Sequence, residues 1–325
     1  MAGGGHGSKA VIAALFANLG IAIAKLVGFA ITGSAAMMAE AIHSIADSGN
    51  QGLLLLGGHR ARRTADEEHP FGYGRERYFW AFIVALVLFS LGGAFAIFEG
   101  IEKIRHPHEL ESAGVAIAIL LVAIGLETFS FRTAIVESNK VRGDATWWQY
   151  IRRSKNPELP VVLLEDLGAE VGLFIALGAI SASIVTDDPI YDGIGTLLIG
   201  LLLTTIAVIL AIEMKSLLVG ETADRKVQST IRARIEADRE VERLIHLRTQ
   251  HLGPDELLIG AKVSFVDGLS VAGLAAAVNR IETNVRAAVP EARVMYLEPD
   301  VLGPQPPADP LTPHGARTGT AGVGE

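Results

Sequence analysis

Cysteine is absent from the 325-residue sequence, and its absence narrows the chemistry open to the protein. Disulfide bonds and thiolate metal ligands are both excluded, so any bound metal ion must be held by histidine, aspartate or glutamate. An excess of positive charge is also lacking, because 28 Lys and Arg stand against 36 Asp and Glu, which gives a net charge of −8. This negative balance argues against nucleic acid as a partner.

Charged residues are missing from several long stretches. Half of all residues are hydrophobic, and the mean hydropathy is +0.38. Ordinary soluble proteins are less apolar, so an α-helical membrane protein that crosses the lipid bilayer several times is the first expectation. Six stretches come near the roughly 20 residues that a helix needs to cross. They lie at about residues 10–32, 34–56, 78–101, 113–136, 159–185 and 190–212.

Basic residues are concentrated in the loops after the second and fourth stretches. The first of these loops contains five arginines, and the second contains Lys140, Arg142, Arg152, Arg153 and Lys155. The positive-inside rule places both loops in the cytoplasm or its topological equivalent, and with six crossings both termini lie there too. A multi-pass protein of a bacterial-type plasma membrane is therefore expected. The three tryptophans fall at the ends of stretches or in a basic loop, as is typical of an interfacial belt.

The composition changes near residue 221 to that of a soluble domain. The pattern predicts a helix at 223–238, strands at 241–249 and 257–266, a helix at 269–289 and a strand at 293–297. The order α-β-β-α-β favours a small cytoplasmic α+β domain of the ferredoxin-like kind. The expected division is a six-helix transmembrane domain at 1–220, this domain at 221–301 and a disordered tail at 302–325, which is rich in Pro, Gly and Thr.

The second apolar stretch contains an ionisable pair. His43 and Asp47 are four residues apart, so on a helix they lie on one face, one turn from each other. A charged residue at mid-bilayer costs about 2.5 to 3.5 kcal/mol on insertion scales, and such groups usually face a protein interior or a watery path. Because imidazole and carboxylate together are ligands of transition-metal ions, the pair predicts a buried metal site.

The fifth stretch repeats this spacing with Asp166 and Glu170. The two stretches run antiparallel, and both pairs fall near mid-bilayer, so four ligands from two helices complete a tetrahedral site of the kind zinc prefers. Glu165 lies about 100° around the helix from Asp166. It either completes the site in place of Glu170 or lines the entry path. A lone acid in the fourth stretch, Glu127, is interpreted as an interhelical hydrogen bond or a protonated carboxyl group.

Four motifs in combination resemble one family. They are Ala-Glu-Ala-Ile-His-Ser-Ile-Ala-Asp at 39–47, Asp-Glu-Glu-His-Pro-Phe-Gly-Tyr-Gly-Arg at 66–75, Asp-Gly at 192–193 and His-Leu-Arg-Thr at 246–249. With them, residues 8–301 resemble the cation diffusion facilitators, and the acidic fifth stretch is similar to the branch that contains the mitochondrial zinc transporter. The resemblance implies a homodimeric divalent-metal/proton antiporter with six spans. It implies no prosthetic group and no enzymatic activity.

The sequence departs from the family's usual pattern in three places. The fifth span commonly reads His-x-x-x-Asp, so the register of Glu165, Asp166 and Glu170 stays open. Tyr73 stands where the loop motif commonly has a histidine, so a loop metal site at Asp66 and His69 is expected to be weak or absent. Three positions of the tail domain lack the histidines that bind a regulatory zinc pair in some members, which favours a dimerisation module. These positions are Ile245, Ala261 and Tyr296.

The expected function is efflux of a divalent cation, Zn²⁺ in first place, in exchange for protons. The same carrier moving Co²⁺, Cd²⁺, Fe²⁺ or Mn²⁺ remains an alternative. A second class is an intramembrane protease, but His-Glu-x-x-His is absent, and Tyr191-Asp192 has no Gly-x-Gly-Asp partner motif. A third is a channel or receptor-like membrane scaffold that signals through the tail domain. Metal flux that requires a proton gradient separates a carrier from both.

Overall fold

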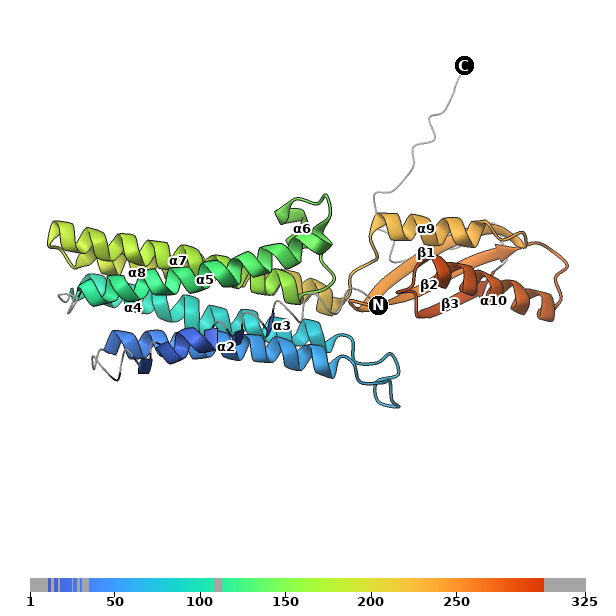
Figure 1. Ribbon diagram of the computed structural model, residues 1–325. Helices are drawn as coiled ribbons and strands as arrows, with labels where there is room; N and C mark the ends of the chain where they lie inside the picture. Colours follow the sequence, from blue (N-terminus) through green and yellow to red (C-terminus); the bar gives the residue numbers. More distant parts are fainter. Residues whose placement is uncertain are drawn as a thin grey trace, which may run out of the picture. The chain divides into compact units, whose positions relative to one another are not determined.

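The computed structural model describes residues 11–12, 15–16, 18–24, 26–27, 30, 35–107 and 113–300 (Figure 1). The tail predicted to be disordered, at 302–325, lies outside the described residues, as does part of the first apolar stretch. The chain divides into two compact units. One comprises residues 1–222 with 250–257, and the other comprises residues 223–249 with 258–325.

The first unit is a bundle of long helices. Its elements are α2 (Ala35–Arg60), α3 (Glu76–Val87), η1 (Leu88–Ala94), α4 (Phe95–Arg105), α5 (Ala113–Arg142), α6 (Trp147–Arg153), α7 (Glu158–Thr186) and α8 (Ile190–Val219). Four helical segments of the described chain are long and apolar enough to cross a membrane, namely Glu76–Arg105, Gly114–Arg142, Glu158–Thr186 and Ile190–Val219. The protein is therefore a mostly helical, multi-pass membrane protein. The count of six crossings stays a prediction.

Several helices continue past the ends expected from hydropathy. The fourth stretch was expected to end at residue 136, but α5 continues to Arg142, and α8 continues to Val219 rather than ending at residue 212. Hydropathy marks the part of a helix that lies in hydrocarbon, whereas backbone hydrogen bonding continues into the polar layer. The basic loop after α5 also contains a short helix, α6, that the sequence reading did not predict.

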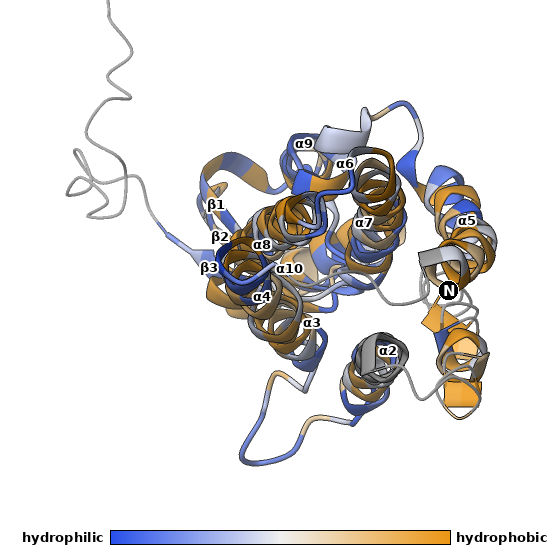
Figure 2. Cartoon of the chain, turned by 90° about the vertical axis from the view of Figure 1, so that its left-hand side faces the viewer, coloured by the Kyte–Doolittle hydropathy of each residue, from blue (hydrophilic) through white to orange (hydrophobic). Residues whose placement is uncertain are grey.

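The outward faces of the bundle are apolar. Figure 2 shows hydrophobic residues around α4, α5, α7 and α8. Phe98 and Phe129 are 68% and 66% exposed, which is unfavourable in water but suited to lipid. The inner faces form one buried cluster that includes Tyr78, Val162 and Leu210.

Helices α4 and α8 approach each other through glycine. A Cβ atom on Gly100 would lie 2.5 Å from the Leu197 backbone nitrogen, and one on Gly200 would lie 2.6 Å from the Ile97 nitrogen. Contacts this close leave no room for any side chain, so the two backbones touch directly. In lipid there is no hydrophobic driving force that brings two helices together. Small residues at such crossings allow close van der Waals packing, which stabilises the helix pair instead.

A seven-residue π-helical segment interrupts the third span. Ser90 lies inside it, and its hydroxyl donates to the Leu86 carbonyl oxygen at 2.8 Å. The two glycines that follow, Gly92 and Gly93, have weak preference for the α-helix. A hydroxyl competing for carbonyl oxygens and two adjacent glycines both loosen the α-helical ladder, which accounts for the wider turns here.

The second unit is a three-stranded sheet with two helices. Its elements are α9 (Arg225–Glu236), β1 (Val241–Gly253), β2 (Glu256–Phe265), α10 (Val271–Ala288) and β3 (Val294–Pro299). The strand order is β1-β2-β3, and β2 pairs in parallel with β3, with Ile259 opposite Met295. Every element predicted between residues 223 and 297 is present, with ends that differ by a few residues.

The buried residues of this unit recur at the spacing expected for a strand or a helix with one buried face. Alternate residues of β2 are buried, among them Ile259 and Val263, and buried residues on α9 and α10 recur at helical spacing. At one edge Arg280 of α10 donates to both Asp238 carboxylate oxygens, at 2.7 and 2.8 Å, and to Glu240 at 2.6 Å. This bidentate pair fixes α10 against the turn that follows α9.

Replacing Gly100 by alanine is expected to destabilise the bundle by about 1 to 3 kcal/mol, because the added methyl group meets backbone rather than a movable side chain. The melting temperature of the detergent-solubilised protein should fall. Gly178→Ala is the matched control, because no atom lies within 4 Å of the position a Cβ would take on Gly178. Equal melting temperatures for both variants would contradict the close approach.

Arg280→Met should loosen α10, measured as faster hydrogen–deuterium exchange of the α10 peptides relative to the unsubstituted protein at the same pH. Hydrogen bonding from Arg280 lowers the pKa of Asp238 in the folded state. The Arg280–Asp238 pair therefore adds to the free energy of unfolding above the pKa of an unfolded aspartate, about 4. This contribution is lost as the pH falls through the pKa of Asp238 in the folded protein.

The difference between this variant and the unsubstituted protein should shrink below about pH 4. Arg286→Met, which removes an exposed pair with Glu282 on the same helix, is the control. A pH-independent difference would contradict the assignment to Asp238.

Candidate metal site

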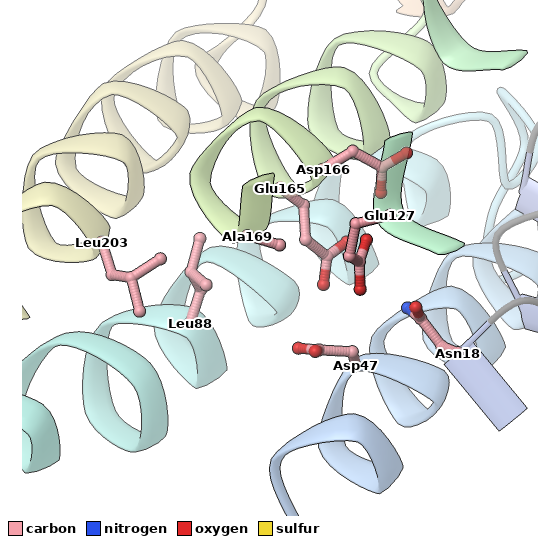
Figure 3. Close-up of a pocket in the computed structure, with 8 residues that line it drawn as sticks. All are labelled: Asn18, Asp47, Leu88, Glu127, Glu165, Asp166, Ala169 and Leu203. Carbon is pink, nitrogen blue, oxygen red and sulfur yellow. The ribbon is translucent and has the colours of Figure 1, made fainter. Parts of the chain in front are cut away.

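A small pocket lies inside the bundle where three helices bring carboxylates together (Figure 3). Asp47 is close to the midpoint of the 26-residue helix α2, and Glu127 is close to the midpoint of the 30-residue helix α5. Glu165 and Asp166 lie about two turns into α7. The full lining is Asn18, Asp47, Leu88, Glu127, Glu165, Asp166, Ala169 and Leu203.

Glu165 is held from α2 by two amides. The Asn50 side chain donates to one carboxylate oxygen at 2.8 Å, and the Gln51 side chain donates to the other at 3.1 Å. Gln51 in turn accepts from the Asn18 amide at 3.3 Å. All four side chains are buried. The carboxylate is therefore fixed in orientation, with its oxygens next to the pocket.

Asp166 and Glu170 are held from the other side, by α5. The Ser130 hydroxyl donates to Asp166 at 2.9 Å, and the Thr128 hydroxyl donates to Glu170 at 2.8 Å. The adjacent residues Glu165 and Asp166 thus form hydrogen bonds with different helices, because consecutive side chains are about 100° apart around a helix. Glu165 faces α2, while Asp166 and Glu170 bond to α5.

The structure does not place all five predicted site residues in the pocket. Asp47, Glu165 and Asp166 line the pocket together, whereas Glu170 is not among the lining residues. His43 belongs to α2, one turn before Asp47, but its side chain lies outside the described residues. Of the alternatives left open by the sequence, the structure puts Glu165 rather than Glu170 beside Asp47.

Glu127 is the pocket residue that the sequence reading did not assign to the site. Figure 3 shows its carboxyl group beside that of Glu165, with Asp47 directed toward the same space. Its central position in α5, followed by Thr128 and Ser130, is the signal that was available. Those two hydroxyls bond to acids of α7, so the same stretch of α5 faces the site.

The electrostatic character of the pocket is uniform. Four carboxyl groups line it, and among the described residues no lysine or arginine does so. Carboxylates gathered in a low-dielectric interior repel each other and lose hydration, so such a group is stable only when protons or a bound cation compensate the charge. The pocket is thus suited to exchanging one kind of positive charge for another.

The donor set fits a small divalent cation, although the ligands are not drawn into a coordination sphere. Among the described residues, no three His, Asp or Glu side chains already hold the geometry of a metal site. The Glu165 and Asp166 carboxyl groups instead accept hydrogen bonds from side chains of α2 and α5.

The loop before α3 contains Asp66 and His69, where a metal site was expected to be weak or absent. Asp66 Oδ1 lies 3.5 Å from His69 Nδ1, and the Tyr73 hydroxyl donates to Asp66 Oδ2 at 2.5 Å. That hydrogen bond is the main reason that the pKa of Asp66 is lowered. The tyrosine thus occupies one carboxylate oxygen and offers no histidine nitrogen, so position 73 supplies no imidazole ligand.

The sequence is similar to a family of cation transport proteins and to several of its members. Residues 11–219 match the family described as the cation efflux transmembrane domain. The sequence is 32% identical over 260 residues to the proton-coupled zinc antiporter SLC30A9, mitochondrial, of Xenopus laevis, over 79% of this chain and 46% of that protein. It is 32% identical over 265 residues to metal tolerance protein C4 of Arabidopsis thaliana, over 80% of this chain and 57% of that protein.

A third relative is the cation-efflux pump FieF of Klebsiella pneumoniae, 30% identical over 148 residues, 44% of this chain and 49% of that protein. The chain spans about half the length of these curated relatives. The match over residues 11–219 covers most of the sequence and includes every helix that lines the acidic pocket. The chain belongs to the cation efflux family, the cation diffusion facilitators.

Proposed function

We propose that the protein exports a divalent metal cation, Zn²⁺ in first place, in exchange for protons. The observation that carries the proposal is the group of four pocket carboxylates, which no lysine or arginine of the described part of the chain accompanies in the lining. Membership of a cation efflux family and the name of the proton-coupled zinc antiporter relative support the same function.

The proposed ligands are His43, Asp47 and Asp166, completed by Glu165. Glu165 is favoured over Glu170 because it shares the pocket with Asp47. One imidazole and three carboxylates make a tetrahedral site that suits Zn²⁺ and also accepts Co²⁺, Cd²⁺, Fe²⁺ or Mn²⁺. Glu127 lies in the same space and adds a fourth carboxylate.

Proton coupling follows from ligand chemistry. Carboxylate and imidazole bind a metal ion only when deprotonated, so metal binding releases protons and the affinity falls as the pH falls. Facing the cytoplasm, the site exchanges protons for metal, and facing an acidic compartment it exchanges metal for protons. Rocking of the helices about a site fixed at mid-membrane supplies the alternation.

The remaining architecture is proposed on the same basis. Six spans place both termini on the cytoplasmic side, the tail unit is a ferredoxin-like dimerisation module, and the active form is a homodimer. The membrane is either a bacterial-type plasma membrane or an organelle membrane, as in the relative whose name says mitochondrial. A scaffold or an intramembrane protease has no support from the relatives, which are named as transport or tolerance proteins.

Replacement of Asp47 by asparagine should lower transport roughly tenfold or more, because it removes a ligand charge while keeping the side-chain shape. The measurement is zinc uptake into proteoliposomes with an imposed proton gradient, reported by a trapped fluorescent chelator. Glu102→Gln, which neutralises an exposed acid of α4, is the control and should retain uptake. Undiminished uptake by Asp47→Asn would remove the site assignment, and uptake independent of the gradient would remove proton exchange.

A matched pair of substitutions tests which acids face the ion. Glu127→Gln and Glu170→Gln make the same change in two buried acids, but only Glu127 lines the pocket. Calorimetric titration with Zn²⁺ should show an affinity about tenfold weaker for Glu127→Gln and a change below about threefold for Glu170→Gln. A greater loss of Zn²⁺ affinity in Glu170→Gln than in Glu127→Gln would contradict this assignment and favour Asp166 and Glu170 as the ligands from α7.

A further inference from the structure

Helix α6 is a well-formed element inside a basic loop. A capping box begins it, since the Thr146 hydroxyl accepts from the Gln149 backbone N–H at 3.2 Å and the Gln149 side chain accepts from the Thr146 N–H at 3.1 Å. Reciprocal bonds of this kind fix the start of a short helix. The faces of α6 therefore have defined directions.

One face of α6 is docked on the bundle. Tyr150 is only 7% exposed and belongs to the main buried cluster, and Ile151 packs against that cluster. Arg152 forms an ion pair with the buried Glu213 of α8, at 3.0 Å. These contacts hold the short helix against α8 and the core.

The first two residues of α6 carry indole rings that are partly exposed. Trp147 is 38% exposed and Trp148 is 56% exposed. A guanidinium group lies over each ring, with Arg142 Cζ 4.5 Å from the Trp147 centroid and Arg152 Cζ 5.8 Å from the Trp148 centroid. Exposed tryptophan beside arginine is costly to leave in water and typical of the boundary between lipid and water.

Not all the positive charge of this segment is neutralised within the bundle. Lys140 pairs with Glu137, Lys155 with Glu221 and Arg152 with Glu213. In the described chain, Arg142 and Arg153 form no ion pair, and Arg142 donates instead to Asn139 and to the Ala145 carbonyl oxygen. The charges of these two guanidinium groups are therefore not neutralised by an acid in the described chain, and Arg142 keeps N–H groups beyond those that donate to Asn139 and Ala145.

The position of α6 decides which anion it meets. Residues 143–146 connect it to the end of α5, and residues 154–157 connect it to the start of α7. Both neighbours are long, apolar helices of membrane-spanning length. A link of this length reaches at most about 14 Å, which keeps α6 near the polar headgroup layer.

We propose that α6 and the end of α5 form a binding surface for anionic phospholipid. The Trp147 and Trp148 rings lie among the headgroups and upper acyl chains, and Arg142 and Arg153 bind the phosphate oxygens. The surface takes anionic rather than zwitterionic lipid because Arg142 and Arg153, which have no acidic partner in the described chain, gain from net negative headgroup charge. It is separate from the acidic pocket and does not depend on metal transport.

The test uses the full chain reconstituted in phosphatidylcholine vesicles. Phosphatidylglycerol or phosphatidylcholine with brominated acyl chains is then added in increasing mole fraction, and tryptophan quenching is followed. Half-maximal quenching should require about fivefold less brominated phosphatidylglycerol than brominated phosphatidylcholine. Trp147→Phe/Trp148→Phe defines the contribution of Trp80, which is subtracted.

Arg142→Gln/Arg153→Gln should abolish the preference, leaving equal quenching by the two lipids. Arg105→Gln, which removes an exposed charge at the end of α4, is the matched control and should keep the preference. Unchanged melting temperatures of the variants establish that folding is intact.

Three results would overturn the proposal. One is equal quenching by both lipids in the unsubstituted protein, and another is a preference that survives Arg142→Gln/Arg153→Gln. The third is no quenching of the α6 tryptophans by either lipid, which would mean that protein, such as a second copy of the chain, covers the rings.

Discussion

The repulsion among buried carboxylates is the constraint on which the rest of the bundle depends. Asp47, Glu127, Glu165 and Asp166 share one pocket, and no lysine or arginine that the structure describes lines it. A group of this kind raises the free energy of the empty, deprotonated state, so the protein is stable only with compensating positive charge. In the antiport proposed above, protons and metal ions are alternative occupants of this pocket and each supplies that charge.

Helix α7 is the element that organises this charge. Glu165 is fixed to α2 through Asn50 and Gln51, while Asp166 is fixed to α5 through Ser130. Neighbouring residues thus link the helix to both of its partners. A shift of α7 along its axis would change the surroundings of both carboxylates together, which couples helix movement to the affinity of the site.

Much of the architecture was predictable because lipid demands long apolar helices and the tail unit obeys simple periodicity. The strands and helices between residues 223 and 297 were expected at nearly their observed positions. The density of carboxylates in the fifth span also indicated the site. The rest could not be predicted, because a period of 3.6 residues does not say which neighbour a face meets. Glu127 therefore looked like an isolated acid, and Glu165 could not be ranked against Glu170. Helix α6 was missed since its capping residues, Thr146 and Gln149, lie in a segment read only for charge.

The π-helical turns between α3 and α4 carry a consequence for how the third span transmits force. Leu88 at their start borders the acidic pocket, and Gly93 and Gly100, at and beyond their end, meet α8 without intervening side chains. A π-helical turn contains more residues than an α-helical turn, so this segment holds extra residues relative to a regular α-helix. Closing or moving these wider turns would rotate α3 relative to α4, and both helices pack against α8. The third span is therefore divided into two segments that can turn by different amounts against the same neighbour.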